Sequence, residues 1–339
     1  MKWPWQRRVR TDRLVVACSP DLFAYVQAQD NRVLRCGVER RGNDAAPAFA
    51  RRVRGLALPG HAVSAVLPLP DCRLLQIEAP AVPAPELRAA ARWRIKDMVD
   101  AHLDDLTLDV MTVGDGRHKA NRQLFVAAAA SRAVRDTAEW SQAVGLPLSV
   151  IEIRETAQRN LQSALAASRN RLAHANAALM VHDDQCLLTI CAQGELFYAR
   201  RLDWDPQALR AQPLASLDVD SRAEVPVQEL ADRDIVDYGA TYESEAALDG
   251  ETPPLVLEVQ RSFDVWERSW PDLPLDRLLV DAGEQSRVLA DALARALTLP
   301  VEVLDVEQVF PGFGQAAGAS AAATLPLLGA LLRSEAHPL

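Results

Sequence analysis

The chain has 339 residues, a formal net charge of −9 and a hydrophobic content of 49%. That apolar share is enough to bury a large core, which excludes wholesale disorder, and the length fits two ordinary domains or one elaborated domain. An acidic total argues against general nucleic-acid binding, because phosphate neutralisation needs clustered Lys and Arg. Five scattered cysteines without a Cys-x-x-Cys motif predict reduced, mostly buried thiols, not a disulfide framework or a zinc ribbon.

The charge is distributed unevenly along the chain. Residues 1–54 hold 12 basic and 5 acidic side chains, whereas residues 203–281 hold 6 basic and 19 acidic ones. The N-terminus lacks the apolar run of a secretory signal, but its tryptophans and cations are of the kind that an anionic bilayer surface attracts. The candidate membrane contacts are Trp3, Trp5, Arg7 and Arg8. The alternative is that these tryptophans pack on the fold.

The first half of the chain is predicted to open with a β-meander. Apolar and β-branched residues predict three strands joined by turn residues, at 13–18, 22–27 and 32–38. Residues 42–62 are mixed and carry no clear pattern. The further predicted elements are strands at 62–67 and 73–78, a helix over 86–99, strands at 106–113 and 124–130, a helix over 132–144, a strand at 148–153 and a helix over 156–175.

A second meander repeats this organisation about 165 residues later. Its strands are predicted at 179–181, 186–192 and 196–202. Residues 203–253 are polar, acidic and proline-bearing and predict loops with some helix. They are followed by a helix over 255–270, a strand at 277–281, a helix over 285–297, a strand at 300–304 and a closing helix. The repetition predicts two related α/β halves, which we place at residues 1–175 and 176–339.

The longest uncharged stretch runs for 17 residues, over 316–332. A membrane-spanning helix needs about 20 mostly apolar residues. This stretch is rich in Ala and is interrupted by Gly318, Ser320, Thr324 and Pro326. It therefore predicts a buried C-terminal helix and not a membrane span.

Motifs of several common enzyme classes are absent from the sequence. There is no His-Glu-x-x-His, no Gly-x-Ser-x-Gly and no P-loop. The six histidines form no ligand pair at helical or strand spacing, which argues against a metal site. Residues 312–317 match Gly-x-Gly-x-x-Ala, but too few residues follow for the second strand of a dinucleotide-binding unit, so we interpret them as a turn.

The repeated meander resembles the actin and sugar-kinase group, in which Asp-x-Gly loops at the two hairpin turns cradle phosphate. Here the first turn is Ser19-Pro20-Asp21 and the second is His182-Asp183-Asp184-Gln185. Neither turn contains glycine, and Pro20 has no N–H to donate. A glycine pair places adenosine in that group, and only Gly283 remains here. The resemblance implies a degenerate nucleotide site, with candidate residues Ser19, Asp21, Asp183, Asp184 and Gly283.

Over most of its length the sequence resembles the MshI family of pilus-biogenesis proteins, which is related to PilM and to the cytoplasmic domain of GspL. The resemblance rests on the order and spacing of several segments and not on one motif. These segments are residues 13–38, 92–97, 124–129, 195–200, 257–264, 279–283 and 327–333. It implies an α/β protein with a duplicated actin-like (RNase H-like) ATPase fold and an inserted subdomain at about 68–130.

The same resemblance implies a non-enzymatic scaffold at the base of an MSHA-type, type IV pilus machine. Such a scaffold is cytoplasmic and peripheral to the inner membrane, and it binds the N-terminal segment of a bitopic PilN-like or MshJ-like protein. It has no resident cofactor, and a homo-oligomer is a further expected partner. Two alternatives stay open: an active PilM-like ATPase that uses ATP and Mg²⁺, and a GspL-like component of a type II secretion system, which would continue into a transmembrane helix.

A cationic stripe lies on the predicted helix over 86–99. Arg88, Arg92 and Lys96 are spaced at i, i+4 and i+8, beside Trp93. These four residues are candidates for binding an acidic partner segment. The alternative is an ordinary solvated helix face.

Overall fold

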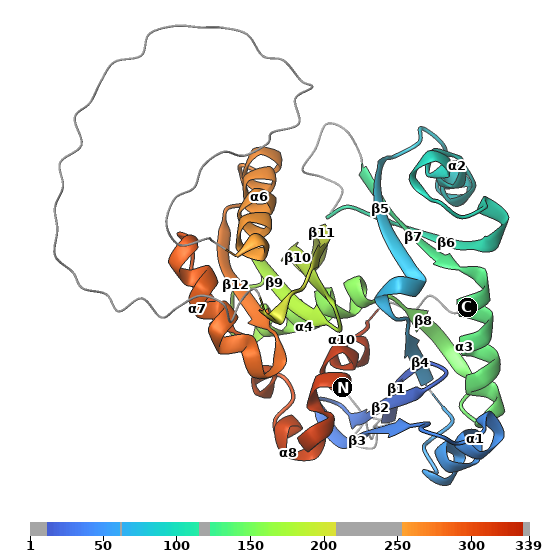
Figure 1. Cartoon of the computed structure of the whole chain (residues 1–339). Helices are drawn as coiled ribbons and strands as arrows, with labels where there is room; N and C mark the ends of the chain where they lie inside the picture. The colour runs from blue at the N-terminus through green and yellow to red at the C-terminus, as the bar shows by residue number, and fades with distance from the viewer. Residues whose placement is uncertain (1–11, 62, 115–122, 208–252, 335–339) are drawn as a thin grey trace, which may run out of the picture.

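The structure is a computed structural model that describes the chain except for residues 1–11, 62, 115–122, 208–252 and 335–339. The described residues form three β-sheets with helices packed around them (Figure 1). Two of these sheets have five strands each, and the third has three. The predicted N-terminal contacts Trp3, Trp5, Arg7 and Arg8 lie outside the described residues.

The sheet of the first half has the order β3-β2-β1-β4-β8. Strands β1 to β3 are antiparallel neighbours, whereas β4 and β8 run parallel to β1. The bounds are β1 (Asp12–Cys18), β2 (Leu22–Gln29), β3 (Arg32–Arg40), β4 (Val63–Val66) and β8 (Leu148–Glu152). The predicted opening meander is therefore confirmed.

The sheet of the second half repeats this topology in the order β11-β10-β9-β12-β13. Its first three strands are again antiparallel, and β12 and β13 run parallel to β9. The bounds are β9 (Ala175–His182), β10 (Gln185–Ala192), β11 (Glu195–Asp203), β12 (Leu275–Asp281) and β13 (Val301–Val303). Equal strand order and equal strand direction confirm the duplicated α/β fold.

A three-stranded antiparallel sheet interrupts the first half between β4 and α3 (Ser131–Ala143). Its order is β5-β7-β6, with β5 (Cys72–Glu78), β6 (Leu106–Thr112) and β7 (Gln123–Ala130). Helix α2 (Leu87–Arg94) covers one face of this sheet through Ala91, together with Ile95 directly after the helix, and both residues are fully buried. This sheet and helix lie within the segment where the inserted subdomain was expected.

Several helices differ from the sequence prediction. Helix α2 ends at Arg94 and a 3₁₀ turn follows, so Met98 is 43% exposed and not on the buried face. Helix α1 (Ala46–Gly55) was missed, although Phe49 and Val53 lie one turn apart and are buried. Helix α4 (Arg154–Ser168) ends earlier than predicted, because the chain turns at Asn170 with a positive φ and β9 begins at Ala175.

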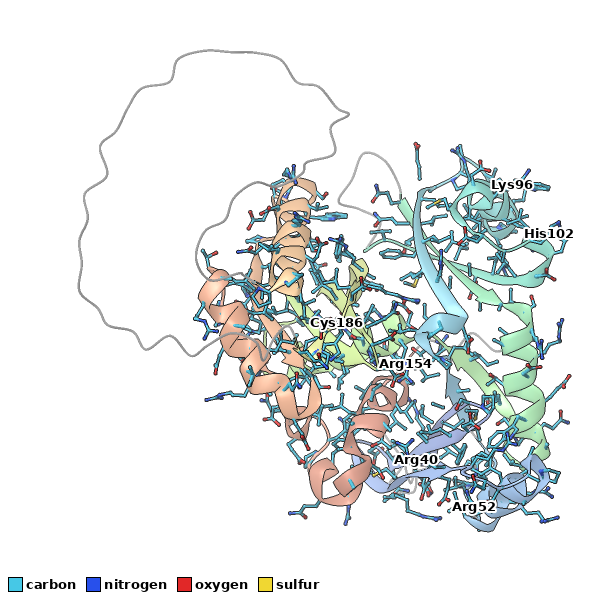
Figure 2. All side chains as sticks on the ribbon, viewed as in Figure 1. Arg40, Arg52, Lys96, His102, Arg154 and Cys186 are labelled. Atoms are coloured by element: carbon cyan, nitrogen blue, oxygen red, sulfur yellow. The ribbon has the colours of Figure 1, made fainter. Side chains whose placement is uncertain are left out.

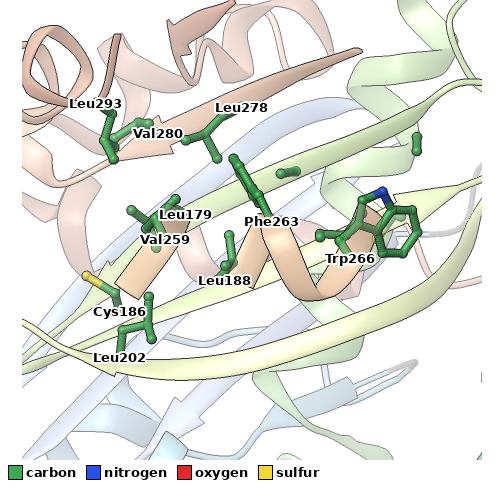
Figure 3. Close-up of a cluster of buried hydrophobic side chains, with 14 of the residues drawn as sticks. Leu179, Cys186, Leu188, Leu202, Val259, Phe263, Trp266, Leu278, Val280 and Leu293 are labelled. Carbon is green, nitrogen blue, oxygen red and sulfur yellow. The ribbon is translucent and has the colours of Figure 1, made fainter. Parts of the chain in front are cut away.

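The core of the second half lies between its sheet and two helices, α6 (Pro254–Ser269) and α7 (Ser286–Ala296). Figure 3 shows Val259, Phe263 and Trp266 of α6 among side chains of the strands, with Leu278 on one side and Leu188 on the other. The ring centroids of Phe197 and Trp270 lie 4.9 Å apart at nearly right angles, an edge-to-face arrangement that aromatic pairs favour.

The closing segment is neither one helix nor buried throughout: residues 324–331 are mostly buried, whereas Ala316, Ala319 and Ala322 are exposed. It is broken into α8 (Phe313–Ala317), α9 (Ala321–Thr324) and α10 (Leu328–Leu331), separated by 3₁₀ turns. Gly318 takes a positive φ, and a turn containing Pro326 separates α9 from α10. Among the helices that the structure describes, none combines the length and the apolar character of a membrane span. Helices α4 and α10 lie side by side between the two halves (Figure 1).

Candidate functional site

The first hairpin turn, between β1 and β2, uses its polar groups to close itself. The backbone N–H of Ser19 donates to the Leu22 carbonyl at 2.8 Å, and the Ser19 hydroxyl oxygen accepts from the Leu22 N–H at 3.1 Å. Asp21 points outward, with its side chain 84% exposed and 3.8 Å from Arg41. The turn amide and hydroxyl that a phosphate would need are therefore already engaged.

The second hairpin turn, between β9 and β10, is a tight turn without glycine. Asp183 takes a left-handed φ of 56°, a conformation that Asp tolerates better than most residues. Asp183 and Asp184 are both exposed. The carbonyl of Asp184 accepts from the Trp204 N–H at 3.0 Å, which fixes the turn to the end of β11.

A group of charged and polar side chains that are wholly or largely buried lies beside this second turn. Helix α4 begins with Arg154, which Figure 2 shows between the two halves of the molecule. Burial lowers the pKa of the Arg154 guanidinium to about 10, and the nearby carboxylates of Asp183 and Glu155 oppose that shift. Burial also lowers the pKa of His182 to about 3, and the cations Arg154 and Arg201 add to this effect. The Nη1 atom of Arg154 and the Nε2 atom of His182 are buried without a hydrogen-bond partner among the described residues.

Arg201 of β11 connects the second half to the first. Its Nη1 donates to the Leu69 carbonyl at 2.6 Å, and its Nη2 donates to the Cys72 carbonyl and to Glu155 Oε1, the latter at 2.8 Å. Glu155 is only 2% exposed, so its charge is compensated in a setting where an unpaired carboxylate would be costly. One arginine thus joins β11, the start of β5 and the start of α4.

Gly283, the candidate adenosine contact, lies just after β12. It has a φ of 57°, and a side chain at this position would meet no atom within 4 Å. The Ser286 hydroxyl donates to the Gly283 carbonyl at 2.7 Å and accepts from the Ala282 N–H at 2.8 Å. Burial raises the pKa of the neighbouring Asp281, against the lowering effect of hydrogen bonds from Gly283 and Ser286. Gly283 therefore serves the local turn and leaves open space beside it.

The candidate partner-binding residues lie on α2 and the turn that follows it. Arg92 is only half-exposed, because its Nη2 donates to the Leu103 carbonyl at 2.5 Å and to Asp104 at 2.9 Å. Trp93 is 71% exposed, and Arg88 and Lys96 are also exposed. Lys96 lies in the 3₁₀ turn beyond the helix, so the predicted three-residue stripe is continuous only from Arg88 to Arg92.

No group of three or more His, Cys, Asp or Glu side chains in the described part of the chain is arranged to hold a metal ion. The turn at Gly312 binds a carboxylate of the same chain. The Glu307 carboxylate accepts from the backbone N–H groups of Gly312 and Gly314 at 2.5 and 2.7 Å. All five cysteines are free and are buried or half-buried.

Comparison with solved structures shows the fold. The PilM-PilN type IV pilus biogenesis complex aligns with 96% of this chain and 99% of its own chain, at 16% identity and a TM-score of 0.65. A Bacteroides thetaiotaomicron protein with an actin-like ATPase fold and unknown function aligns over 91% and 95% of the two chains, at 9% identity and a TM-score of 0.49. The cytoplasmic domain of EpsL, an inner-membrane component of the type II secretion system of Vibrio cholerae, aligns over 91% and 96%, at 13% identity and a TM-score of 0.43.

The chain has the actin-like ATPase fold, as its two topologically equal sheets and the PilM-PilN alignment indicate. Scans against protein-family models and curated protein sequences give no match.

The buried charges that lie between the halves were not predicted from the sequence. Arg154, Glu155 and Arg201 were not singled out, and His182 was noted only as a turn residue. A signal was present for the first two, because a charged pair directly follows the predicted strand at 148–153. No local pattern distinguished Arg201, because its partners lie 46 and more residues away along the chain.

Proposed function

We propose that this protein is a cytoplasmic, MshI-type component of a type IV pilus assembly machine, positioned at the inner membrane. In this proposal it binds the cytoplasmic N-terminal segment of a PilN-like or MshJ-like membrane protein. The observation that carries the proposal is the alignment with the PilM-PilN complex over 96% of this chain and 99% of that one. The two halves at 1–175 and 176–339, with an insertion at about 68–130, are the domains of this scaffold.

We further propose that the protein works as a scaffold and not as an ATPase. The first hairpin turn uses its Ser19 N–H and hydroxyl internally, and the second contains two carboxylates and no glycine. Phosphate-binding loops need free backbone N–H groups, and in the first turn Pro20 has none and the Ser19 N–H is already bonded to the Leu22 carbonyl. Ser19, Asp21, Asp183, Asp184 and Gly283 are therefore remnants of a nucleotide site in this proposal.

The partner surface and the membrane surface are part of the same proposal. Arg88 and Lys96 present exposed positive charge beside Trp93, and an exposed aromatic next to cations is a common element of protein interfaces. The N-terminal residues Trp3, Trp5, Arg7 and Arg8 would face anionic lipid.

Isothermal titration with a synthetic peptide of the PilN-like protein's cytoplasmic N-terminal segment tests the function. We expect saturable binding, and no binding by a scrambled peptide of the same composition. Failure of the native-sequence peptide to bind the folded protein would contradict the proposed partner. The variant Trp93→Ala should weaken binding about tenfold if the surface of α2 takes part, because central aromatic contacts contribute about 1–2 kcal/mol or more.

A further inference from the structure

A positively charged surface lies on strand β3 and helix α1, at one end of the first half. Residues 32–54 include seven arginines and two carboxylates. Five of these arginines are exposed and have no carboxylate within ion-pair distance among the described residues. They are Arg32, Arg35 and Arg40 of β3 and Arg51 and Arg54 of α1. We call these five residues the β3–α1 face.

The strand and the helix are joined, so that their arginines share one end of the molecule. The Nη2 atom of Arg35 donates to the carbonyl of Leu56, directly after α1, at 3.0 Å. Further along β3, Arg52 of α1 donates to Glu39 Oε2 at 3.1 Å and to the carbonyl of Arg40. Helix α1 therefore runs alongside β3 in the opposite direction. Figure 1 shows both elements at the end of the first half that is opposite to α2, and Figure 2 shows Arg40 and Arg52 there.

The carboxylates of the same stretch do not neutralise this face. Glu39 and Asp44 both form ion pairs with Arg52, which is not one of the five. Asp21 and Asp30 lie in the two hairpin turns of the meander, and Asp21 is 3.8 Å from Arg41. Arginines therefore remain in excess at this end of the molecule.

A β-bulge in β3 exposes an aliphatic side chain among these cations. The register between β2 and β3 shifts so that Leu34 has no partner residue on β2. A bulge changes the direction in which its side chains point, and Leu34 is 41% exposed, between the exposed Arg32 and Arg35. An apolar side chain flanked by cations is the combination that lies in the interface of an anionic bilayer.

The second half of the molecule has the opposite charge. Its described residues, 176–207 and 253–334, include 8 basic and 16 acidic side chains, not counting histidine. An anionic surface would attract the β3–α1 face and repel the second half, which favours one orientation of the molecule. Charge on an edge strand also prevents strand pairing between molecules, but that explanation does not account for the exposed arginines on α1.

The N-terminal residues join the fold beside this surface. Strand β1 begins at Asp12, which pairs with Gln29, and Gln29 pairs in turn with Arg32 of β3. Residues 1–11, which precede Asp12, include two tryptophans and four cations. The candidate membrane contacts in that segment are therefore connected to the same end of the molecule as the β3–α1 face.

We propose that the β3–α1 face binds an anionic phospholipid surface, with its arginines at the phosphate groups and Leu34 in the interfacial region. Bound in this way, the protein turns its acidic second half away from the lipid. The inference rests on the proposed function for the location at the inner membrane, and it adds the folded surface that contacts the lipid.

The test is co-sedimentation of the full chain with phosphatidylcholine vesicles, with and without phosphatidylglycerol, in the absence of any partner protein. We expect binding only to the vesicles that contain phosphatidylglycerol, and weaker binding at higher salt because exposed charges are screened. The double variant Arg40→Glu with Arg51→Glu should bind at least about tenfold more weakly, since each cation near an anionic surface strengthens binding severalfold.

The matched control is Arg287→Glu with Arg295→Glu. Both residues are exposed on α7 of the second half, and the change in net charge is the same. This variant should bind the vesicles as the unmodified protein does. An equal loss in the two double variants would overturn the proposal, because binding would then follow net charge and not the β3–α1 face.

A gain of binding gives a second measurement, which a folding defect cannot mimic. Leu34→Trp should strengthen binding about threefold or more, because tryptophan favours the bilayer interface. Unchanged binding in both Leu34→Trp and the Arg40/Arg51 variant would overturn the face, and so would preference of the unmodified protein for soluble poly-glutamate over the vesicles. These outcomes leave the partner proposal intact, because peptide titration tests it separately. Vesicle binding as expected, with no binding of the partner peptide, would overturn the partner and support the face.

Discussion

Gly329 of α10 lies directly against the backbone carbonyl oxygen of Ala157 in α4, so close that a β-carbon at position 329 would overlap that oxygen. The contact lies where the two halves meet. Helix α4 is fixed to the second sheet by Gln158, whose Nε2 donates to the carbonyls of Ala178 and Leu187 at 3.0 Å. Helix α10 lies against β1 of the first sheet. The close approach of these helices therefore connects the two halves.

Gly329→Ala is expected to destabilise the protein by about 3 kcal/mol or more. The added methyl group meets backbone and not a flexible side chain, so relief requires α4 and α10 to move apart and opens gaps in the core around Leu161 and Leu328. The measurement is the free energy of unfolding from urea denaturation.

Gly55→Ala is the matched control. Gly55 is the last residue of α1, and a side chain there would meet no atom within 4 Å. Alanine should be neutral or stabilising by up to about 1 kcal/mol, because it has the higher helix propensity. If Gly329→Ala proves as stable as Gly55→Ala, helices α4 and α10 tolerate separation, and their close approach at Gly329 is not required for stability.

Arg201→Met is expected to cost about 3–5 kcal/mol of the free energy of unfolding. The substitution removes the donors to the Leu69 and Cys72 carbonyls and the arginine that forms an ion pair with the buried Glu155 carboxylate. Adding Glu155→Gln to this variant should restore part of the loss, because a neutral amide costs less to bury than a charge. Chemical denaturation of the single and double variants measures the loss of unfolding free energy in Arg201→Met and its partial recovery on adding Glu155→Gln.

The control for Arg201 is Arg132→Met. Arg132 pairs with Asp136 on the surface of α3, with both side chains largely exposed, and such pairs contribute little. A loss below about 1 kcal/mol in Arg201→Met would argue that the bridge between the halves is energetically incidental.

Mg-ATP is expected to leave the melting temperature of the protein unchanged. A ligand that binds only the folded state raises its stability in proportion to the logarithm of the ligand concentration over Kd. The Ser19 N–H and hydroxyl are engaged within the first turn, and the second turn carries Asp183 and Asp184. A titration that gives a Kd below about 100 µM would contradict the scaffold proposal and favour an active ATPase.

The sequence predicts the sheets of this fold better than its helices or its site. Strand periodicity is local, so the two meanders and the strand at 124–130 are read from neighbouring residues. Helix α1 was missed because the cluster at Arg51, Arg52 and Arg54 masks its two buried residues, Phe49 and Val53. Helix ends depend on turn geometry, as at Asn170, and are harder to place than strands.

The buried charges between the halves depend on tertiary contacts that local patterns do not encode. Glu155 and Arg201 come from α4 and β11 and meet only when the halves pack together. The two hairpin turns could be located from the sequence, because a turn between strands has a local signature. The hydrogen bonds of Ser19 within the first turn could not be predicted from the sequence, because the folded backbone sets them. The same holds for the position of Arg154 beside the second turn.

The stability of the protein should fall as the pH is lowered below about 6.5, because of His182. Burial, with Arg154 and Arg201 nearby, lowers the pKa of this imidazole from 6.5 to about 3 in the folded state. Between those two values the unfolded chain binds a proton that the folded chain does not, so each pH unit costs about 1.4 kcal/mol. Lowering the pH from 7 to 5 should therefore remove about 2 kcal/mol through this group. In His182→Gln the free energy of unfolding should fall by about 2 kcal/mol less between pH 7 and pH 5. The matched control His61→Gln, at an exposed histidine, should show the same pH dependence as the unmodified protein. Parallel urea denaturation curves at pH 5 and pH 7 measure the difference, and an unchanged slope in His182→Gln would show that His182 is not held neutral between the halves.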